Sequence, residues 1–186
     1  MKVALSLRQS EDNELLVKLL EELPQFEITD LNNLSEGTVV ITNGPLTQLA
    51  KLLYRDFTAK KKIAKILLVG GTDAYGDITV RAEKNIYEDP ESAQHVFLSG
   101  IPIVMFGLNV TEALGNRALA PLVYLLKPEV FESEECGVFV ETQGTITRGA
   151  TVTDLYSDKQ FEDHFVQLVK SVNMPGYIEV LKDLRG

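Results

Sequence analysis

The sequence of 186 residues contains one cysteine, Cys136, and no tryptophan. A single cysteine cannot form a disulfide within the chain, and the paired-cysteine spacing of zinc sites is missing. This use of cysteine fits a reducing compartment, so we expect a cytoplasmic protein. Cys136 directly follows Glu134 and Glu135, and their charges oppose thiolate formation. We therefore expect Cys136 to be structural and not nucleophilic.

Histidine and long apolar runs are also scarce. His95 and His164 are the only histidines, and neither has a Ser, Cys or metal-ligand pattern around it, which favours structural roles. No apolar stretch approaches the ~20 residues of a membrane-spanning helix, and the first seven residues are too short for a signal-peptide core. The sequence has no P-loop and no nucleophile elbow. We expect no contact with a membrane.

Basic residues are outnumbered, with 18 Lys and Arg against 27 Asp and Glu and a formal net charge of −9. This charge disfavours non-specific binding to nucleic acid or anionic membrane, because both require a basic face. A neutral small molecule is not excluded. The one basic run, residues 60–62, is interpreted either as a phosphate patch or as a solvated approach to a strand. We favour the second in so acidic a chain.

The order of apolar segments predicts an α/β fold. Hydrophobic residues make up 45% of the chain, which suits one globular domain spanning residues 1–186. We expect a Rossmann-like, mainly parallel open sheet flanked by helices, with a late β-hairpin around Gln143-Gly144. Strands are predicted at 2–7, 26–31, 38–42, 63–69, 101–106, 138–141, 145–147 and 150–154; helices at 11–23, 46–54, 89–99, 111–126, 161–172 and 177–184.

Small polar residues follow three of the predicted strands, at Asn43-Gly44-Pro45, Gly70-Gly71-Thr72 and Gly107-Leu108-Asn109. In open α/β sheets, ligands bind at the carboxyl ends of the strands, and glycine lets a ligand approach the backbone closely. A long polar segment, residues 76–90, then leads into a helix. Long loops of this kind often hold binding residues. The sequence thus predicts a ligand site at this edge of the sheet.

Several sequence blocks resemble the nucleoside hydrolase family, in the family's order. They are residues 43–50 (NGPLTQLA), 66–71 (ILLVGG), 82–93 (AEKNIYEDPESA), 101–111 (IPIVMFGLNVT), 124–131 (YLLKPEVF) and 144–154 (GTITRGATVTD). The chain is identified as a shortened and divergent member of the inosine/uridine-preferring nucleoside hydrolases. The resemblance implies hydrolysis of the N-glycosidic bond of ribonucleosides, a ribonucleoside or other ribose-containing ligand, and a homo-oligomer.

The resemblance also implies roles for individual residues. By family position, Asp77, Glu83 and Asn85 would contact the ribose, while the Thr47 carbonyl and Asp12 would belong to a calcium site. Glu83 and Asn85 have a second interpretation, in which they order the loop and cap backbone groups. We keep both interpretations open.

Other positions depart from the family. Arg8 stands where a metal-binding aspartate is expected, and Arg117 and Ala118 occupy the positions of a His-Asp pair. Calcium requires about six to eight oxygen ligands, so we expect no bound cofactor, and no catalytic residue can be named. Two hypotheses follow. One is a divergent nucleoside hydrolase with a rebuilt metal site or none; the other is a non-catalytic member that binds a ligand or a protein.

Overall fold

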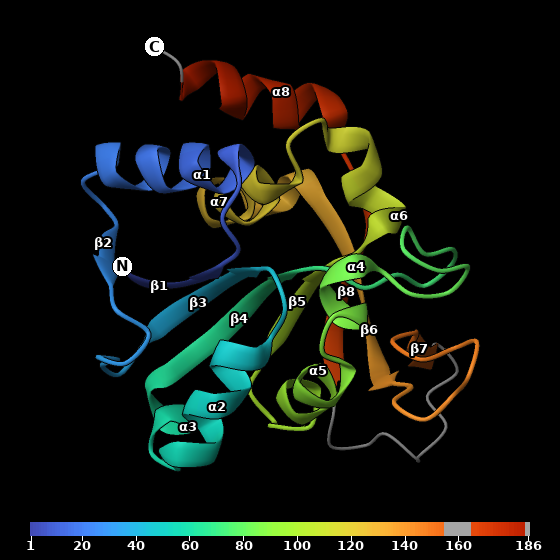
Figure 1. Cartoon of the computed structure of the whole chain (residues 1–186). Helices are drawn as coiled ribbons and strands as arrows, with labels where there is room; N and C mark the ends of the chain where they lie inside the picture. The colour runs from blue at the N-terminus through green and yellow to red at the C-terminus, as the bar shows by residue number, and fades with distance from the viewer. Residues whose placement is uncertain (155–164, 185–186) are drawn as a thin grey trace.

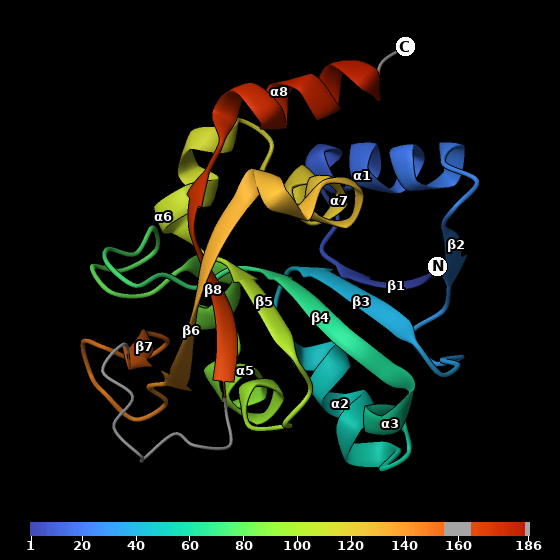
Figure 2. The same ribbon diagram turned by 180° about the vertical axis from the view of Figure 1, so that it is seen from behind.

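A computed structural model describes residues 1–154 and 165–184 of the chain. Within these residues, eight strands form one sheet in the order β2-β1-β3-β4-β5-β8-β6-β7 (Figures 1 and 2). The first six strands in this order are parallel, and β6 is antiparallel to both of its neighbours. The strands are β1 (Lys2–Leu7), β2 (Glu27–Thr29), β3 (Thr38–Asn43), β4 (Ile63–Val69), β5 (Ile103–Phe106), β6 (Phe131–Val140), β7 (Thr151–Asp154) and β8 (Phe165–Val172). The predicted mainly parallel α/β fold is confirmed.

Helices cover both faces of the sheet, and strand residues alternate between them. One face packs against α2 (Thr47–Arg55), α3 (Ala59–Lys62) and α5 (Pro90–Phe97). The other packs against α1 (Glu11–Glu22), α7 (Ala120–Leu126) and α8 (Met174–Asp183), as Figure 1 shows. Val40 of β3 lies in the first core and Ile41 in the second. This period of two gives the sheet a buried apolar layer on each side.

The helix starts follow the expected capping chemistry. The Ser10 side chain accepts a hydrogen bond from Asn13 N and caps α1. Asp89 caps α5 by accepting from Ser92 N, with Pro90 in the first turn, where its missing N–H does no harm. The predicted helix at 111–126 is interrupted at Gly115, which has φ 65°. It divides into α6 (Leu108–Thr111), two short 3₁₀ segments and α7.

Two predictions near the C-terminus were wrong. Residues 165–172 form the strand β8 and not a helix, because β5 and β6 pair with it on both sides and its β-branched Val166, Val169 and Val172 suit a strand. Residues 161–164 of that predicted helix lie outside the described residues. The late antiparallel pair exists, but residues 145–147 form a turn and not its second strand. β7 takes that place, with Val140 opposite Thr151.

The order β2-β1-β3-β4-β5 creates a switch point between β1 and β3. The helix after β1 lies on one face of the sheet and the helix after β3 lies on the other. The crevice outside the carboxyl ends of β1 and β3 is therefore left uncovered, which is where doubly wound sheets bind ligands. In the part of the chain that the structure describes, none of the helices has the length and apolarity needed to cross a membrane.

Candidate functional site

A cleft of about 750 Å³ lies at the switch point. Ser6 and Arg8 line it from the end of β1, and Asp30 and Asn32 line it from the segment after β2. Pro45, Thr47 and Gln48 complete it at the start of α2. Its volume is in the range of small-molecule sites, and its walls offer both hydrogen-bond donors and acceptors.

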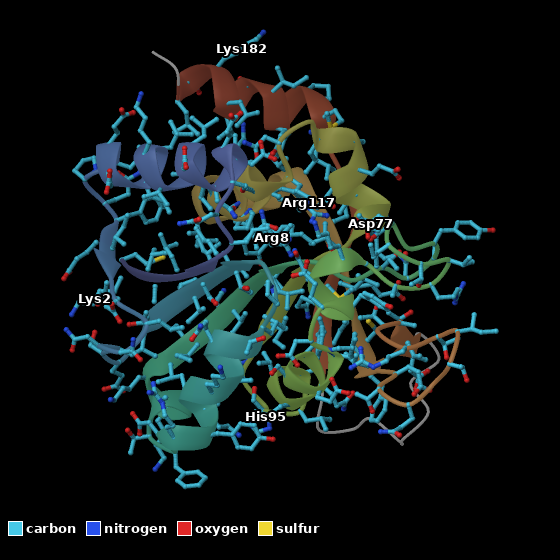
Figure 3. The ribbon with its side chains drawn as sticks, viewed as in Figure 1. Lys2, Arg8, Asp77, His95, Arg117 and Lys182 are labelled. Atoms are coloured by element: carbon cyan, nitrogen blue, oxygen red, sulfur yellow. The ribbon has the colours of Figure 1, made fainter. Side chains whose placement is uncertain are left out.

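Arg8 forms the inner wall of this cleft. Its backbone N donates to Asn43 O (3.1 Å), which continues the pairing of β1 with β3. Its guanidinium group contacts both carboxylate oxygens of Glu88, at 3.2 and 2.9 Å, and donates to Asn85 Oδ1 at 2.5 Å. Figure 3 shows Arg8, Arg117 and Asp77 at the same edge of the sheet, near α4 (Lys84–Tyr87). A fixed cation therefore lies beside the switch point.

Glu83 is fully buried directly before α4. Its Oε2 accepts hydrogen bonds from the backbone N–H groups of Gly71 (3.1 Å), Asn85 (2.9 Å) and Ile86 (3.3 Å). Its Oε1 lies 3.1 Å from Arg117 Nη2. Burial raises the pKa of Glu83, while the Arg117 cation and the Gly71 N–H oppose that rise. Glu83 is thus a helix cap and the partner of a guanidinium group.

Asp77 belongs to the same cluster. Its Oδ1 accepts from Lys84 N at 2.8 Å, and its Oδ2 lies 3.8 Å from Arg117 Nη1. Arg117 therefore bridges Asp77 in the polar loop and Glu83 at the start of α4, and these two predicted site residues lie together.

Asn85 belongs to a chain of buried side-chain amides. Its Nδ2 donates to Val69 O (2.8 Å) and to Asn43 Oδ1 (3.1 Å). Asn43 Nδ2 donates to Asn13 Oδ1 (2.9 Å), and Asn13 Nδ2 donates to Arg8 O (2.8 Å). The network ties the carboxyl ends of β1, β3 and β4 together. The sequence predicts that Asn43 follows a strand at the ligand-binding edge of the sheet, but it predicts no role for Asn13.

Thr47 and Asp12 are the two residues that the resemblance assigned to a calcium site. The Thr47 hydroxyl lines the cleft and donates to Asp89. Burial acts to raise the pKa of Asp89, but hydrogen bonds from Thr47 and Ser92 outweigh it and lower that pKa. Asp12 is exposed in the first turn of α1. Within residues 1–154 and 165–184, neither side chain has a hydrogen bond or ion pair to Asp77, Glu83 or Asn85.

The residues at this edge do not fit a calcium ion. Guanidinium groups already neutralise Glu88, Glu83 and Asp77, and a cation at the strand end opposes the anionic oxygen shell that calcium requires. Among the described residues, no group of three or more His, Cys, Asp or Glu side chains could hold a metal ion. The expectation that no cofactor is bound stays a prediction.

The remaining candidate side chains lie elsewhere. His95 stacks on Tyr54, with ring centroids 3.8 Å apart, and Figure 3 shows it far from Arg8 and Arg117. His164 lies outside the described residues. Cys136 is buried in β6, where burial and the Glu134 charge raise the pKa of its thiol to about 11. That environment suppresses the reactive thiolate.

A doubly wound sheet with a polar cleft at its switch point is the architecture of a small-molecule-binding α/β protein. Comparison with known proteins defines it further. The sequence profile of the inosine-uridine preferring nucleoside hydrolases matches residues 8–121. The chain is also 35% identical, over 82% of its length, to the pyrimidine-specific ribonucleoside hydrolase RihA of Escherichia coli K12. The chain belongs to the inosine-uridine preferring nucleoside hydrolase family.

Solved structures agree on the fold. A nucleoside hydrolase of Bacillus anthracis superposes with a TM-score of 0.81 at 16% identity, covering 98% of both chains. A purine-preferring ribonucleoside hydrolase of Gardnerella vaginalis gives a TM-score of 0.63 at 21% identity, covering 92% of this chain and 64% of its own. The chain spans 62% of the length of the E. coli relative.

Proposed function

We propose that this chain binds ribonucleosides in the switch-point cleft and does not hydrolyse them by a calcium-dependent route. The observation that carries the proposal is the Arg8 guanidinium, bound to Glu88 and Asn85 beside the cleft. Family membership supports the ligand class, since a relative is named as a ribonucleoside hydrolase. The cleft is large enough for a nucleoside, and Asp30, Asn32 and Gln48 can bond sugar hydroxyls or base edges.

Hydrolysis requires an activated water, and the arginines do not supply one. A guanidinium group stays protonated at all physiological pH values and carries no acceptor, so it cannot take a proton from water. A bound metal lowers the pKa of its water ligand, but Arg8 and Arg117 act as hydrogen-bond donors and counter-charges. The buried Glu83 caps a helix and pairs with Arg117, and this engagement supports a structural role.

Metal-independent hydrolysis is the second candidate. Asp77 and Glu88 are the carboxylates of the cluster that reach solvent, with side-chain exposures of 39% and 37%. Either could serve as a general base for water attacking the anomeric carbon, in the manner of carboxylates in glycosidases. In this candidate, ribonucleosides are hydrolysed with a carboxylate as the general base and without a metal ion.

Two measurements on the same protein separate the candidates. Calorimetric titration with uridine, cytidine and inosine measures binding, and chromatography measures released base in calcium and in a chelator. We expect binding without base release in either condition. Asn32→Leu should weaken binding, whereas the matched change Asn33→Leu, at the neighbouring residue outside the cleft lining, should not.

The outcomes are distinct. Absence of binding by all three ribonucleosides at millimolar concentration would overturn the proposal. Base release that survives the chelator and is lost in Asp77→Asn or Glu88→Gln would select the second candidate. Base release that requires calcium would refute both. The cytoplasmic location, the single domain over residues 1–186 and the homo-oligomer stay predictions.

A further inference from the structure

A separate cavity of about 370 Å³, which we call the β7 cavity, lies between the polar loop after β4 and the segment that includes β7. It is lined from the loop by Asp73 and Arg81, and from residues 141–153 by Glu141, Thr147, Thr151 and Thr153, among others. Both views place this loop and β7 on the same side of the molecule (Figures 1 and 2). Among the described residues, none lines both the β7 cavity and the switch-point cleft. The β7 cavity is therefore a candidate for a second binding site.

Hydrogen bonds join the two walls of the β7 cavity. The buried Thr151 hydroxyl donates to Thr72 O (2.5 Å) and accepts from Thr72 N (2.8 Å). Ala82 and Ala150 form an isolated antiparallel bridge. The loop and the β7 segment are thus tied together on both sides of the polar loop's tip, and the cavity exists before any ligand binds. Small-molecule sites are usually pre-formed in this way.

Three charged side chains line the β7 cavity, and two of them have unused binding capacity. Asp73 Oδ2 accepts a hydrogen bond from Lys170 Nζ at 2.5 Å, so its charge is compensated. Glu141 Oε1 accepts two backbone N–H groups of the following turn, at 2.7 and 3.0 Å. In the described chain, Glu141 Oε2 has no partner, and the Arg81 guanidinium has no hydrogen bond or ion pair. A cation and an anion therefore line one cavity without an ion pair between them.

This arrangement selects the charge of a ligand. A ligand that enters the cavity displaces water from Arg81 and from Glu141, and a charge that loses water needs a new partner. A neutral ligand supplies no counter-charge, and a simple anion or cation supplies a counter-charge to one of the two residues only. A zwitterion supplies both. Charge-assisted hydrogen bonds are also about twice as strong as neutral ones.

We propose that the β7 cavity binds a small zwitterion of the α-amino acid class, with its carboxylate on Arg81 and its ammonium group on Glu141. A carboxylate matches the planar fork of a guanidinium group. An ammonium group has three donors, which Glu141 Oε2 and the hydroxyls of Thr147 and Thr153 can accept. Val152 also lines the cavity and offers apolar surface to the ligand's side chain.

Calorimetric titration with glycine, serine, threonine and valine tests the proposal. We expect at least one of these amino acids to bind at millimolar concentration. The matched probes are the amide and the N-acetyl derivative of the amino acid that binds, since the first lacks the carboxylate and the second lacks the ammonium charge. Each derivative should bind at least about tenfold more weakly, because it leaves either Arg81 or Glu141 without a counter-charge.

Two variants remove one charge each. Arg81→Gln should bind the amino acid at least about tenfold more weakly and should lose the discrimination against the amide. Glu141→Gln keeps an acceptor for the turn and should lose the discrimination against the N-acetyl derivative. Arg81→Lys keeps the charge and should retain more affinity than Arg81→Gln. Lys51→Gln and Glu36→Gln are the controls, because they remove exposed charges outside the cavity, and they should bind like the wild type.

The outcomes separate this site from the switch-point cleft. Asn32→Leu changes the lining of the cleft and not that of the β7 cavity, so amino acid binding should be unchanged in this variant whether or not ribonucleosides bind. Loss of amino acid binding in Asn32→Leu would overturn the proposal. So would the absence of binding by all four amino acids at about 10 mM, equal binding of either derivative, or wild-type affinity in both Arg81→Gln and Glu141→Gln.

Discussion

The Arg117 guanidinium lies 3.1 Å from the carboxylate of Glu83, whose side chain has no exposed surface. The other carboxylate oxygen of Glu83 accepts three backbone N–H groups from the end of β4 and the start of α4. Burial raises the pKa of Glu83, and Arg117 limits that rise. Glu83 thus caps α4, accepts the Gly71 N–H that follows β4, and pairs with the Arg117 cation from a distant segment.

Replacing Glu83 with glutamine should flatten the dependence of stability on pH. The pKa of Glu83 is higher in the folded chain than its ordinary 4.5. Between these two pKa values, the folded state therefore holds a proton that the unfolded state has lost. The wild-type free energy of unfolding should therefore fall as pH rises from 4.5 to the folded-state pKa, by at most about 1.4 kcal/mol per pH unit. Urea unfolding at a series of pH values measures the slope.

The Arg117→Met variant provides the matched test. Removing the cation raises the folded-state pKa of Glu83 further, so the pH window in which stability falls should extend upward. The variant should lose about 1–3 kcal/mol near neutral pH, because a buried carboxylate loses its counter-charge. An unchanged pH profile in both variants would show that Glu83 does not titrate differently in the folded chain.

Arg8→Ala should lower the free energy of unfolding by about 1–2 kcal/mol. The change removes the contacts to Glu88 and leaves the buried Asn85 Oδ1 without its donor. Arg148→Ala is the control, because Arg148 also pairs with a glutamate, Glu91. Both side chains of this pair are more exposed, at 41% and 58%, than those of the Arg8 pair, at 25% and 37%. Exposed pairs contribute little, so the control should change by less than about 0.5 kcal/mol. Equal effects in urea unfolding would contradict a special role for Arg8.

Much of the fold could be predicted because local patterns and tertiary packing agree. Ser10 and Asp89 cap helices as their sequence positions suggest, and the parallel strands are short runs rich in β-branched residues. The prediction of a helix over residues 165–172 is wrong, because the apolar spacing of this segment also fits a helix. Its pairing with β5 and β6 decides the outcome, and a pattern read along one segment does not contain that information.

The candidate site was predictable only in part. The resemblance brought Asp77 and Glu83 to attention, and the structure brings them together through Arg117. The sequence left open whether Glu83 contacts a ligand or caps the backbone, and the contacts of the folded chain include the capping bonds. The part played by Asn13 could not be foreseen, because it depends on the register that places β1 beside β3.

Gly76→Ala should disrupt the loop that carries Asp77. A Cβ atom at Gly76 would lie 2.1 Å from Ala82 O and 2.4 Å from Ala82 N, so the backbone itself must move. We expect a loss of more than about 2 kcal/mol in the free energy of unfolding. Gly37→Ala is the control, because Gly37 has φ +81° and no atom within 4 Å of an added Cβ. It should lose only the backbone strain of about 1 kcal/mol. Similar losses in the two variants would contradict this account of the loop.

Calcium should leave the melting temperature unchanged. A ligand present at 100 times its Kd stabilises a protein by about 2.7 kcal/mol, which would raise the melting temperature of a chain of this size by about 5–10 °C. Arg8 and Arg117 already neutralise the carboxylates at the strand ends, so we expect a shift below about 1 °C in calorimetric scans with millimolar calcium. Magnesium at equal concentration controls for ionic strength. A shift of several degrees with calcium alone would mean that oxygen ligands displace the guanidinium groups, and Arg8→Ala should then enlarge it.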